Sequence, residues 1–234
     1  MSASSEQAQC LACPTARICL ARTLDSAGLE KLSRTLPPPD MLAPGEFAYR
    51  LGDRTDRVYV LRSGAVKTIT ITPSGEEHVT GFHFAGEMFG LIGFTTGQHV
   101  NSAVALDTSS VCRISTAQLP ELWSIGCDRG FLGLIGEREN ATLQQRLLMG
   151  KSRADARLSA FLLQMCERQE RRGVSPESLY LPMRRTDLAN YLGMTLESLS
   201  RTFRRLSDAV LIQVDGAYVQ VCKPGELATI AGDY

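Results

Sequence analysis

The sequence predicts an α+β fold that combines an antiparallel β-roll, a long helix and a winged helix-turn-helix. Short β-like runs between glycine turns fill residues 47–114, a pattern typical of compact antiparallel barrels and rolls. From Thr116 onward, apolar residues recur with the helical period instead. Near the C-terminus, two short helical patterns flank a turn that contains Gly193, and such a pair is typical of a helix-turn-helix.

The composition is that of an ordinary globular chain, with 44% hydrophobic residues, 21% charged residues and a formal net charge of +0. Charge alone therefore gives no indication of a nucleic-acid partner. The N-terminus lacks the features of a secretory signal, and no apolar run approaches the roughly 20 residues that cross a bilayer. We therefore expect a cytoplasmic protein with no membrane partner. In that reducing compartment, the seven cysteines indicate metal binding, redox sensing or burial rather than disulfides.

The first part of the chain divides into a cysteine-rich segment, residues 1–24, and a roll domain, residues 25–127. A short helix is expected from Ser26 to Leu36, where Pro37–Pro39 ends it. Runs of β-forming residues bounded by glycine turns then predict the strands of the roll. The clearest of these runs are Arg57–Leu61, Ala65–Ile71, His78–Phe82, Ser102–Leu106 and Ser110–Ile114.

A long helix is expected over residues 128–150. Four of its apolar residues recur at a spacing similar to that of a coiled coil: Leu132, Ile135, Leu143 and Leu147. Glu139 and Thr142 interrupt the apolar seam, so the pattern suits a helix of an intramolecular bundle as well as a dimer interface. Gly150-Lys151-Ser152 follows as an expected hinge, where we place the start of a C-terminal domain of residues 151–234.

The C-terminal domain contains the pattern of a winged helix-turn-helix. Thr186 is expected to cap the first helix, Gly193 to end it in the left-handed conformation and Thr195 to cap the second helix. An apolar stripe for burial runs along the second helix, made of Leu199, Phe203 and Leu206. Two alternating runs about an Asp-Gly turn in residues 211–221 predict a β-hairpin, which would form the wing.

Another face of the second helix carries polar groups that suit the reading of base edges. Its members are Glu197, Ser200, Arg201 and Arg204. Arginine binds guanine with two hydrogen bonds, glutamate accepts from the cytosine amine, and recognition helices use residues of their N-terminal half. The alternative is a solvated face with an i,i+4 ion pair between Glu197 and Arg201. Because the caps, the turn and the hairpin accompany this face, we expect double-stranded DNA as the partner, which also favours the dimer.

Three cysteines near the N-terminus, Cys10, Cys13 and Cys19, have the spacing C-x2-C-x5-C. Their thiolates can converge on one metal centre, for which a fourth ligand must come from elsewhere in the chain. The same thiolates suit zinc as well as an iron–sulfur cluster. The sequence contains no P-loop, dinucleotide fingerprint or nucleophile–base pattern, and three histidines offer little catalytic chemistry. We therefore expect a protein that is not an enzyme.

Together these features resemble the Crp/Fnr family of transcription regulators, and most closely its fumarate-and-nitrate-reduction regulator (FNR) branch. The resemblance is carried by TGFHFAGE at residues 80–87, ANYLGMT at residues 189–195 and LESLSR at residues 196–201. It implies a cyclic-nucleotide-binding-like β-roll that senses the signal, a dimerisation helix and a winged helix-turn-helix. The E-x-x-S-R pattern matches the reader of TTGAT-type half-sites in that branch, which implies base recognition by the residues of that pattern, Glu197, Ser200 and Arg201.

The same resemblance implies an oxygen-sensitive [4Fe–4S] cluster. In the FNR branch, an N-terminal C-x2-C-x5-C trio ligates the cluster together with a cysteine late in the roll. Cys112 stands in the similar stretch of residues 107–114, and Cys127 is the alternative. An intact cluster would favour a homodimer on a pseudo-palindromic DNA site, and oxygen would weaken that dimer. The alternative function is a regulator of the same family that senses thiol redox, zinc or a small ligand without a cluster.

Cyclic AMP is not expected as a ligand. Nucleotide-binding members of the family share Gly86-Glu87, but their phosphate cassette continues with an arginine that grips the cyclic phosphate. Asn101 stands at that position here, and a buried phosphate without a guanidinium partner would be poorly compensated. RNA polymerase is an expected partner of the DNA-bound dimer, and the turn of residues 73–77 is the candidate contact.

Overall fold

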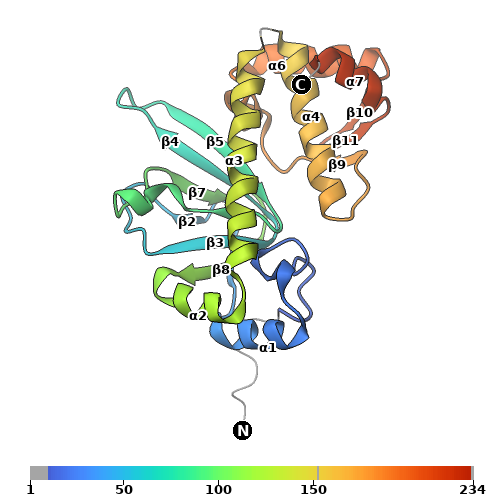
Figure 1. Cartoon of the computed structure of the whole chain (residues 1–234). Coiled ribbons are helices and arrows are strands. Elements are labelled where there is room, and N and C mark those ends of the chain that lie inside the picture. Colours follow the sequence, from blue (N-terminus) through green and yellow to red (C-terminus); the bar gives the residue numbers. More distant parts are fainter. Residues whose placement is uncertain (1–9, 152, 233–234) are drawn as a thin grey trace. The chain divides into compact units, whose positions relative to one another are not determined.

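The computed structural model describes residues 10–151 and 153–232 (Figure 1). Predictions for residues 1–9, Ser152 and residues 233–234 lie outside the described residues. They concern the start of the N-terminal segment, part of the hinge and the end of the C-terminal domain. The chain forms two compact units, one that ends at Asn140 and one that begins at Ala141. This division falls within the long helix, before the hinge at Gly150-Lys151-Ser152 where the sequence predicts the boundary.

The α+β class predicted from the sequence is confirmed, because strands dominate the first unit and helices follow. Along the described chain, the elements are η1 (Leu20–Thr23), α1 (Ser26–Thr35), β1 (Asp40–Leu42), β2 (Phe47–Tyr49), β3 (Arg57–Ser63), β4 (Ala65–Ile71), β5 (Glu77–Phe84), β6 (Met88–Phe89), η2 (Ile92–Thr95), β7 (Ser102–Ala105), β8 (Ser109–Ser115), η3 (Thr116–Gln118), α2 (Leu119–Ile125), α3 (Asp128–Gly150), α4 (Ala154–Arg171), β9 (Ser178–Tyr180), α5 (Arg185–Tyr191), α6 (Leu196–Asp208), β10 (Ile212–Asp215), β11 (Tyr218–Val221) and α7 (Pro224–Ala231).

The β-roll is built from antiparallel sheets, one with the strand order β1-β8-β3-β6 and another with the order β2-β7-β4-β5 (Figure 1). The runs predicted as strands are found as strands; β4 has the predicted bounds, and β8 extends slightly further at both ends. The sequence does not predict β1, β2 or β6, because runs of two or three residues are too short to show an alternation.

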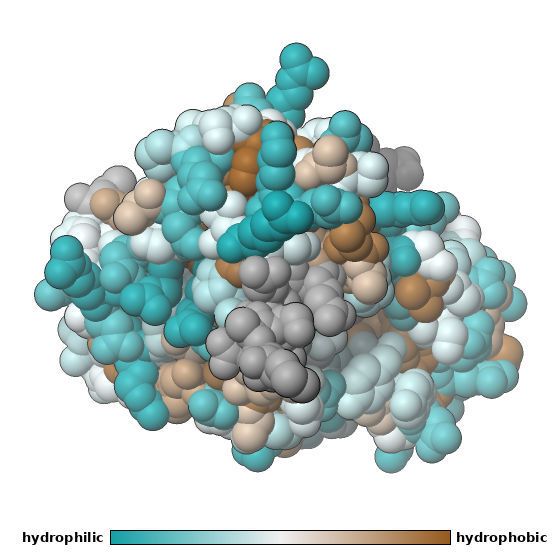
Figure 2. All heavy atoms as spheres, turned by 90° about the horizontal axis from the view of Figure 1, so that it is seen from below, coloured by the Kyte–Doolittle hydropathy of each residue, from teal (hydrophilic) through white to brown (hydrophobic). Residues whose placement is uncertain are grey.

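One face of the molecule, drawn in Figure 2, is mostly hydrophilic and carries its hydrophobic residues in scattered patches. Scattered apolar residues are ordinary on a protein surface that faces water. In the part of the chain that the structure describes, no helix combines the length and the apolarity that spanning a membrane requires.

An apolar core, here called the N-terminal core, joins the N-terminal segment to the roll and to the first turns of α3. Its buried residues are Cys19, Leu20, Ala21, Leu32, Leu36, Val58, Val60, Met88, Ile114, Leu122, Cys127, Phe131 and Leu134. Burial of a large apolar side chain contributes about 1.5–3 kcal/mol, so this core holds α1 and α2 firmly against the roll. It also determines where the cysteines lie.

The interior of the roll contains buried polar side chains around Asn101. The rings of Tyr49 and His99 stack with centroids 3.6 Å apart, and the Tyr49 hydroxyl donates to Oδ1 of Asn101 over 3.2 Å. Burial lowers the pKa of His99, so its ring is neutral at pH 7. Asn101 is therefore engaged inside the roll by a neighbouring side chain.

The second unit contains the predicted winged helix-turn-helix. Thr195 caps α6, because its hydroxyl accepts the N–H of Ser198 over 3.1 Å. Gly193 lies between α5 and α6 with φ +61, the left-handed conformation expected of it. Arg157 closes this turn, since its guanidinium donates to the carbonyls of Leu192 and Gly193 over 3.0 and 2.9 Å.

The prediction that Thr186 caps the first helix of this motif is wrong. α5 begins at Arg185, and Arg184 precedes it in the extended conformation without a side-chain cap. Tertiary contacts fix the first turn there, because Met183 is buried and the Arg185 guanidinium stacks on the Phe203 ring at 3.9 Å. The wing hairpin is present, and β9 joins it to give the strand order β10-β11-β9.

Candidate cysteine centre and DNA-reading face

The trio Cys10, Cys13 and Cys19 lies on a folded segment of tight turns. The N–H of Cys13 donates to the carbonyl of Cys10 over 3.2 Å, and the N–H of Cys19 donates to the carbonyl of Thr15 over 2.9 Å. Cys19 caps η1, where its sulfur accepts a backbone N–H over 3.4 Å. The N–H of Cys10 donates to the hydroxyl of Ser33 on α1 over 2.9 Å. These bonds hold the trio close to α1.

Cys112 lies on β8, opposite Val60 of β3. It is half-buried and packs against the N-terminal core, as does Cys10. Cys19 and Cys127 are buried within that core. The structure therefore brings to one core cysteines from the N-terminal segment, from β8 and from the residue just before α3.

Thiols of the trio lie close enough to Cys112 and Cys127 to raise the pKa of both. Burial, and then the charges of Cys10, Cys13 and Cys19, raise the pKa of Cys112 to about 12. Burial, and then Cys19 and Cys10, raise the pKa of Cys127 to about 12 as well. Coulomb interactions weaken with distance. Cys112 is therefore close to all three cysteines of the trio, and Cys127 is close to two of them, Cys10 and Cys19.

A donor set made only of thiols fits both an iron–sulfur cubane and a tetrahedral zinc site. Arg62 on β3 supplies a positive charge that opposes the rise in the pKa of Cys10 and Cys112. Such a charge favours the thiolate form in which cysteine binds metals. Within residues 10–151 and 153–232, no three cysteine, histidine or acidic side chains are grouped closely enough to hold a metal ion.

Helix η1, which follows the trio, lies directly on the start of α3. A Cβ atom on Gly130 would overlap with the carbonyl of Leu20, and one on Gly133 would overlap with the guanidinium of Arg22. Arg22 forms an ion pair with Glu137 and donates to the carbonyl of Gly130 over 3.3 Å. Two glycines of α3 therefore allow the cysteine-bearing segment to pack against this helix.

Helix α3 exposes three of the four apolar residues predicted for a dimer interface. Leu132 is 65% exposed, Leu143 is 52% exposed and Leu147 is 47% exposed. Their positions along one continuous helix place them on one face. Ile135 is instead partly buried against the N-terminal core, so it connects the helix to the region of the cysteines.

The polar residues predicted to read bases lie on the exposed side of α6. They are Glu197, Ser200, Arg201 and Arg204, and the predicted apolar stripe of Leu199, Phe203 and Leu206 is buried. Arg201 donates to Glu197 over 3.0 Å, and the two side chains are 71% and 77% exposed. Exposed pairs of this kind contribute little free energy, so either side chain can exchange its partner for a base.

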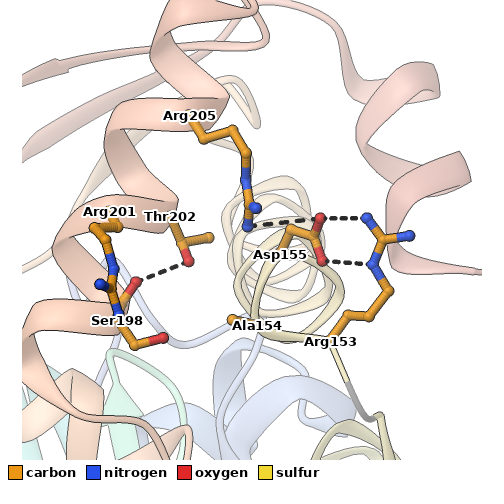
Figure 3. A pocket seen from close by; sticks show the side chains of 7 residues that line it. All are labelled: Arg153, Ala154, Asp155, Ser198, Arg201, Thr202 and Arg205. Atoms are coloured by element: carbon orange, nitrogen blue, oxygen red, sulfur yellow. Dashed lines mark hydrogen bonds and ion pairs between the residues drawn. The ribbon is translucent and has the colours of Figure 1, made fainter.

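A pocket beside this face combines Ser198 and Arg201 of the predicted motif with residues that no sequence motif identifies (Figure 3). It has a volume of about 470 Å³, and its lining residues are Arg153, Ala154, Asp155, Ser198, Arg201, Thr202 and Arg205. Arg205 follows Arg201 by one helical turn, which is the one signal in the sequence. Arg153 and Asp155 join them because α4 packs against α6, a contact that the sequence does not show.

Both units match families of known domains. Residues 40–124 match the cyclic nucleotide-binding domain, and residues 156–230 match the Crp-like helix-turn-helix domain. The structure of FixK2 from Bradyrhizobium japonicum shares the fold, with a TM-score of 0.73 at 24% identity over 84% of this chain and 98% of that chain. TTHB099 of Thermus thermophilus, a regulator of the CRP family, has a TM-score of 0.66 at 18% identity over 82% of this chain and 96% of its own.

Relatives of known role are similar over nearly the whole chain. The transcriptional activator protein Anr of Pseudomonas protegens is 39% identical over 228 residues, which cover 97% of this chain and 93% of the relative. The fumarate and nitrate reduction regulatory protein of Vibrio cholerae is 32% identical over 230 residues, which cover 95% of this chain and 90% of the relative. These relatives are transcription regulators and not enzymes. The chain therefore belongs to the Crp/Fnr family of DNA-binding transcription regulators, in the branch of the Anr and fumarate and nitrate reduction regulators.

Proposed function

We propose that this chain is an oxygen-responsive transcription regulator of the cytoplasm. A [4Fe–4S] cluster held by Cys10, Cys13, Cys19 and Cys112 would allow it to bind pseudo-palindromic TTGAT-type DNA sites as a homodimer. The observation that carries the proposal is that Cys10, Cys19 and Cys112, from two distant segments of the chain, pack at the N-terminal core, and that the whole trio raises the pKa of Cys112. The Anr and fumarate and nitrate reduction relatives support the same assignment.

The contacts of η1 suggest how the state of the cysteines would reach α3. When bound, the cluster would supply oxygen-labile iron–sulfur bonds between the N-terminal segment and β8. The Arg22–Glu137 ion pair seats the segment on α3, and Ile135 packs against the same core. Holding the segment against β8 would therefore favour one arrangement of α3, and a ligand that favours one arrangement shifts the equilibrium toward it.

The exposed leucines of α3 would form the interface of the homodimer. A dimer of this type places its two recognition helices about 34–36 Å apart, one turn of DNA. Glu197, Ser200 and Arg201 would then read one half-site in each protomer, with Arg204 beside them. All four side chains are exposed.

The turn between β4 and β5 would contact RNA polymerase. Its residues 73–77 are exposed, and the backbone is held by a bond from the N–H of Gly75 to the carbonyl of Thr72 over 2.9 Å. A second bond, from the N–H of Thr72 to the carbonyl of Glu76, has the same length of 2.9 Å. A turn held by backbone hydrogen bonds can present its side chains to a partner with a smaller loss of entropy on binding.

A second candidate keeps the family and the DNA site but has no iron–sulfur cluster. The all-thiol donor set supports it as well as it supports the cluster, because four thiolates also suit zinc. Direct sensing of thiol redox is less well supported. Burial raises the pKa of Cys19 to about 11, and oxidants react with the thiolate rather than with the neutral thiol.

The test is DNA binding by the full chain after anaerobic cluster reconstitution, measured by fluorescence anisotropy before and after exposure to air. One duplex carries a TTGAT palindrome, and a control duplex carries the same bases with scrambled half-sites. The proposal predicts binding to the palindrome about 10³-fold or more tighter than to the control, and loss of this preference in air. A zinc-loaded protein with equal preference in both atmospheres would contradict the proposal and favour the second candidate.

A further inference from the structure

The pocket in Figure 3 is formed by one face of α6 and the first turn of α4. From α6 come Ser198, Arg201, Thr202 and Arg205, whose spacing of three and four residues places them on one side of that helix. From α4 come its N-cap Arg153 and the two residues that follow. Since Arg201 also belongs to the predicted base-reading face, the pocket borders the surface that would meet DNA.

Asp155 lies between two arginines from different helices (Figure 3). Its side chain is 9% exposed, whereas those of Arg153 and Arg205 are 76% and 60% exposed. Arg153 donates to both carboxylate oxygens, over 2.7 and 3.2 Å, and Nη2 of Arg205 lies 3.6 Å from Oδ2. A buried carboxylate thus holds two exposed guanidinium groups beside each other.

The carboxylate of Asp155 is ionised at neutral pH. Burial alone would raise its pKa, but the bond from Arg153, the N–H of Ala156 and the charges of both arginines lower it overall. The pocket therefore combines three guanidinium groups with one carboxylate inside it. Each guanidinium has five N–H donors, so the two arginines on Asp155 retain donors for a further anion.

We propose that this pocket receives a phosphate of the DNA backbone, held by Arg153 and Arg205, and that Asp155 is the positioning residue that keeps the two guanidinium groups together. The proposal rests on DNA binding by α6 and adds a contact that fixes the register of the recognition helix. Contacts to phosphates position a protein on the duplex, whereas contacts to base edges specify the sequence. Arginine forks match the geometry of phosphate oxygens.

The alternative is an ion-pair network that only ties α4 to α6. The two cases differ in the salt dependence of DNA binding, because each neutralised phosphate contributes about 0.9 to the slope of log K against log salt. A purely structural network would change the melting temperature of the protein and leave that slope unchanged.

The experiment compares the reconstituted full chain with Arg205→Gln and Arg153→Gln, on the TTGAT duplex and on the scrambled duplex, at several salt concentrations. Each variant is expected to make the slope shallower by up to about 0.9 and to weaken binding to both duplexes. The loss is expected to be larger on the TTGAT duplex, because the contact also holds α6 in register. Arg171→Gln is the matched control. It removes the same charge from an exposed position at the opposite end of α4. Its slope of log K against log salt is expected to equal that of the unmodified chain.

Asp155→Asn tests the positioning role, because it keeps both arginines. Removal of the carboxylate adds one net positive charge, which strengthens binding to any DNA. The two arginines are, however, no longer held in register, so the ratio of the affinity for the TTGAT duplex to that for the scrambled duplex is expected to fall. Asp155→Glu, which retains the carboxylate, is expected to recover part of the ratio. An unchanged ratio together with a lower melting temperature would show that Asp155 is only structural.

Two outcomes would overturn the phosphate contact. One is an unchanged slope in both arginine variants, while the unmodified chain binds both duplexes. The other is that the pocket binds inorganic phosphate at constant ionic strength and Arg205→Gln abolishes this binding, but the salt dependence of DNA binding does not change. Failure of the unmodified chain to bind either duplex would instead overturn DNA binding by α6, so the two failures are distinguishable.

Discussion

At the scale of single residues, two cysteines outside the trio compete as the fourth ligand of the proposed cluster. Cys112 is half-buried and packs at the edge of the N-terminal core, whereas Cys127 is 0% exposed inside it. The pKa of Cys112 is raised by the whole trio and that of Cys127 by two of its members. A ligand has to reach the same centre as the trio, so these surroundings favour Cys112.

Replacement of either cysteine by alanine distinguishes them. Cys112→Ala is expected to lower the iron content after anaerobic reconstitution from about four per chain to nearly none, because a cubane needs its four protein ligands. Cys127→Ala, the matched control, is expected to keep its iron and to lose on the order of 1 kcal/mol of stability from the cavity. Iron and sulfide assays measure both variants. Retention of iron by Cys112→Ala and its loss from Cys127→Ala would reverse the assignment.

Arg201 is the residue of the base-reading face with the clearest expected partner, a guanine of the half-site. Its ion pair with Glu197 is exposed and does not hold it away from DNA. Arg201→Ala is expected to reduce the preference for the TTGAT duplex over the scrambled duplex by about 1–3 kcal/mol. Anisotropy titrations under nitrogen give this difference directly. If the preference stayed the same, the recognition face would lie elsewhere on α6.

At the scale of elements, the sequence predicts those whose pattern is local. The β4 and β8 runs, the Thr195 cap and the Gly193 turn depend on neighbouring residues only, and all are found. The strand β9 and the start of α5 depend on tertiary contacts, such as the stacking of Arg185 on Phe203. The sequence therefore does not predict β9 and places the first cap wrongly at Thr186.

The same distinction applies to the candidate sites. The spacing of the cysteine trio and the polar face of α6 can be predicted from the sequence, since each lies on one continuous segment. The packing of η1 on Gly130 and Gly133 cannot be predicted, because these residues are far apart along the chain. The link from Asp155 on α4 to Arg205 on α6 also depends on how two elements pack.

The close packing of η1 on α3 predicts opposite effects of two glycine substitutions in this helix. Gly130→Ala places a Cβ against the backbone of Leu20, which cannot move without shifting η1, so we expect a loss of about 1–3 kcal/mol. Gly136→Ala meets nothing within 4 Å and is expected to gain about 0.5–1 kcal/mol from helix propensity. Urea unfolding of the aerobic protein measures the free energy of unfolding of both variants without a contribution from dimerisation. Equal stabilities would show that η1 does not pack on α3 in this way.

At the scale of the whole molecule, the proposed function requires a dimer that brings together two recognition helices. The exposed leucines of α3 are the surface available for it. Leu143→Glu is expected to give a monomer under nitrogen. Because this residue occurs twice in a symmetric dimer, losing its burial weakens association by about 3–6 kcal/mol, roughly 100-fold or more in Kd.

Sedimentation velocity under nitrogen measures this change. Leu51→Glu is the control, since Leu51 in the roll is 46% exposed and Leu143 is 52% exposed, and its dimer is expected to stay intact. A Leu143→Glu protein that remained dimeric would place the interface on another surface.

The proposed function depends on an oxygen-labile cluster held by the cysteines at the N-terminal core. The most direct measurement is the visible absorption spectrum of the anaerobically purified chain during controlled addition of air, with iron and sulfide assays alongside. We expect a broad brown absorption from about four irons per chain, which bleaches as oxygen is added. A colourless protein that takes up no iron on reconstitution would contradict the proposed function, and would transfer the sensing role to zinc, thiol redox or another ligand.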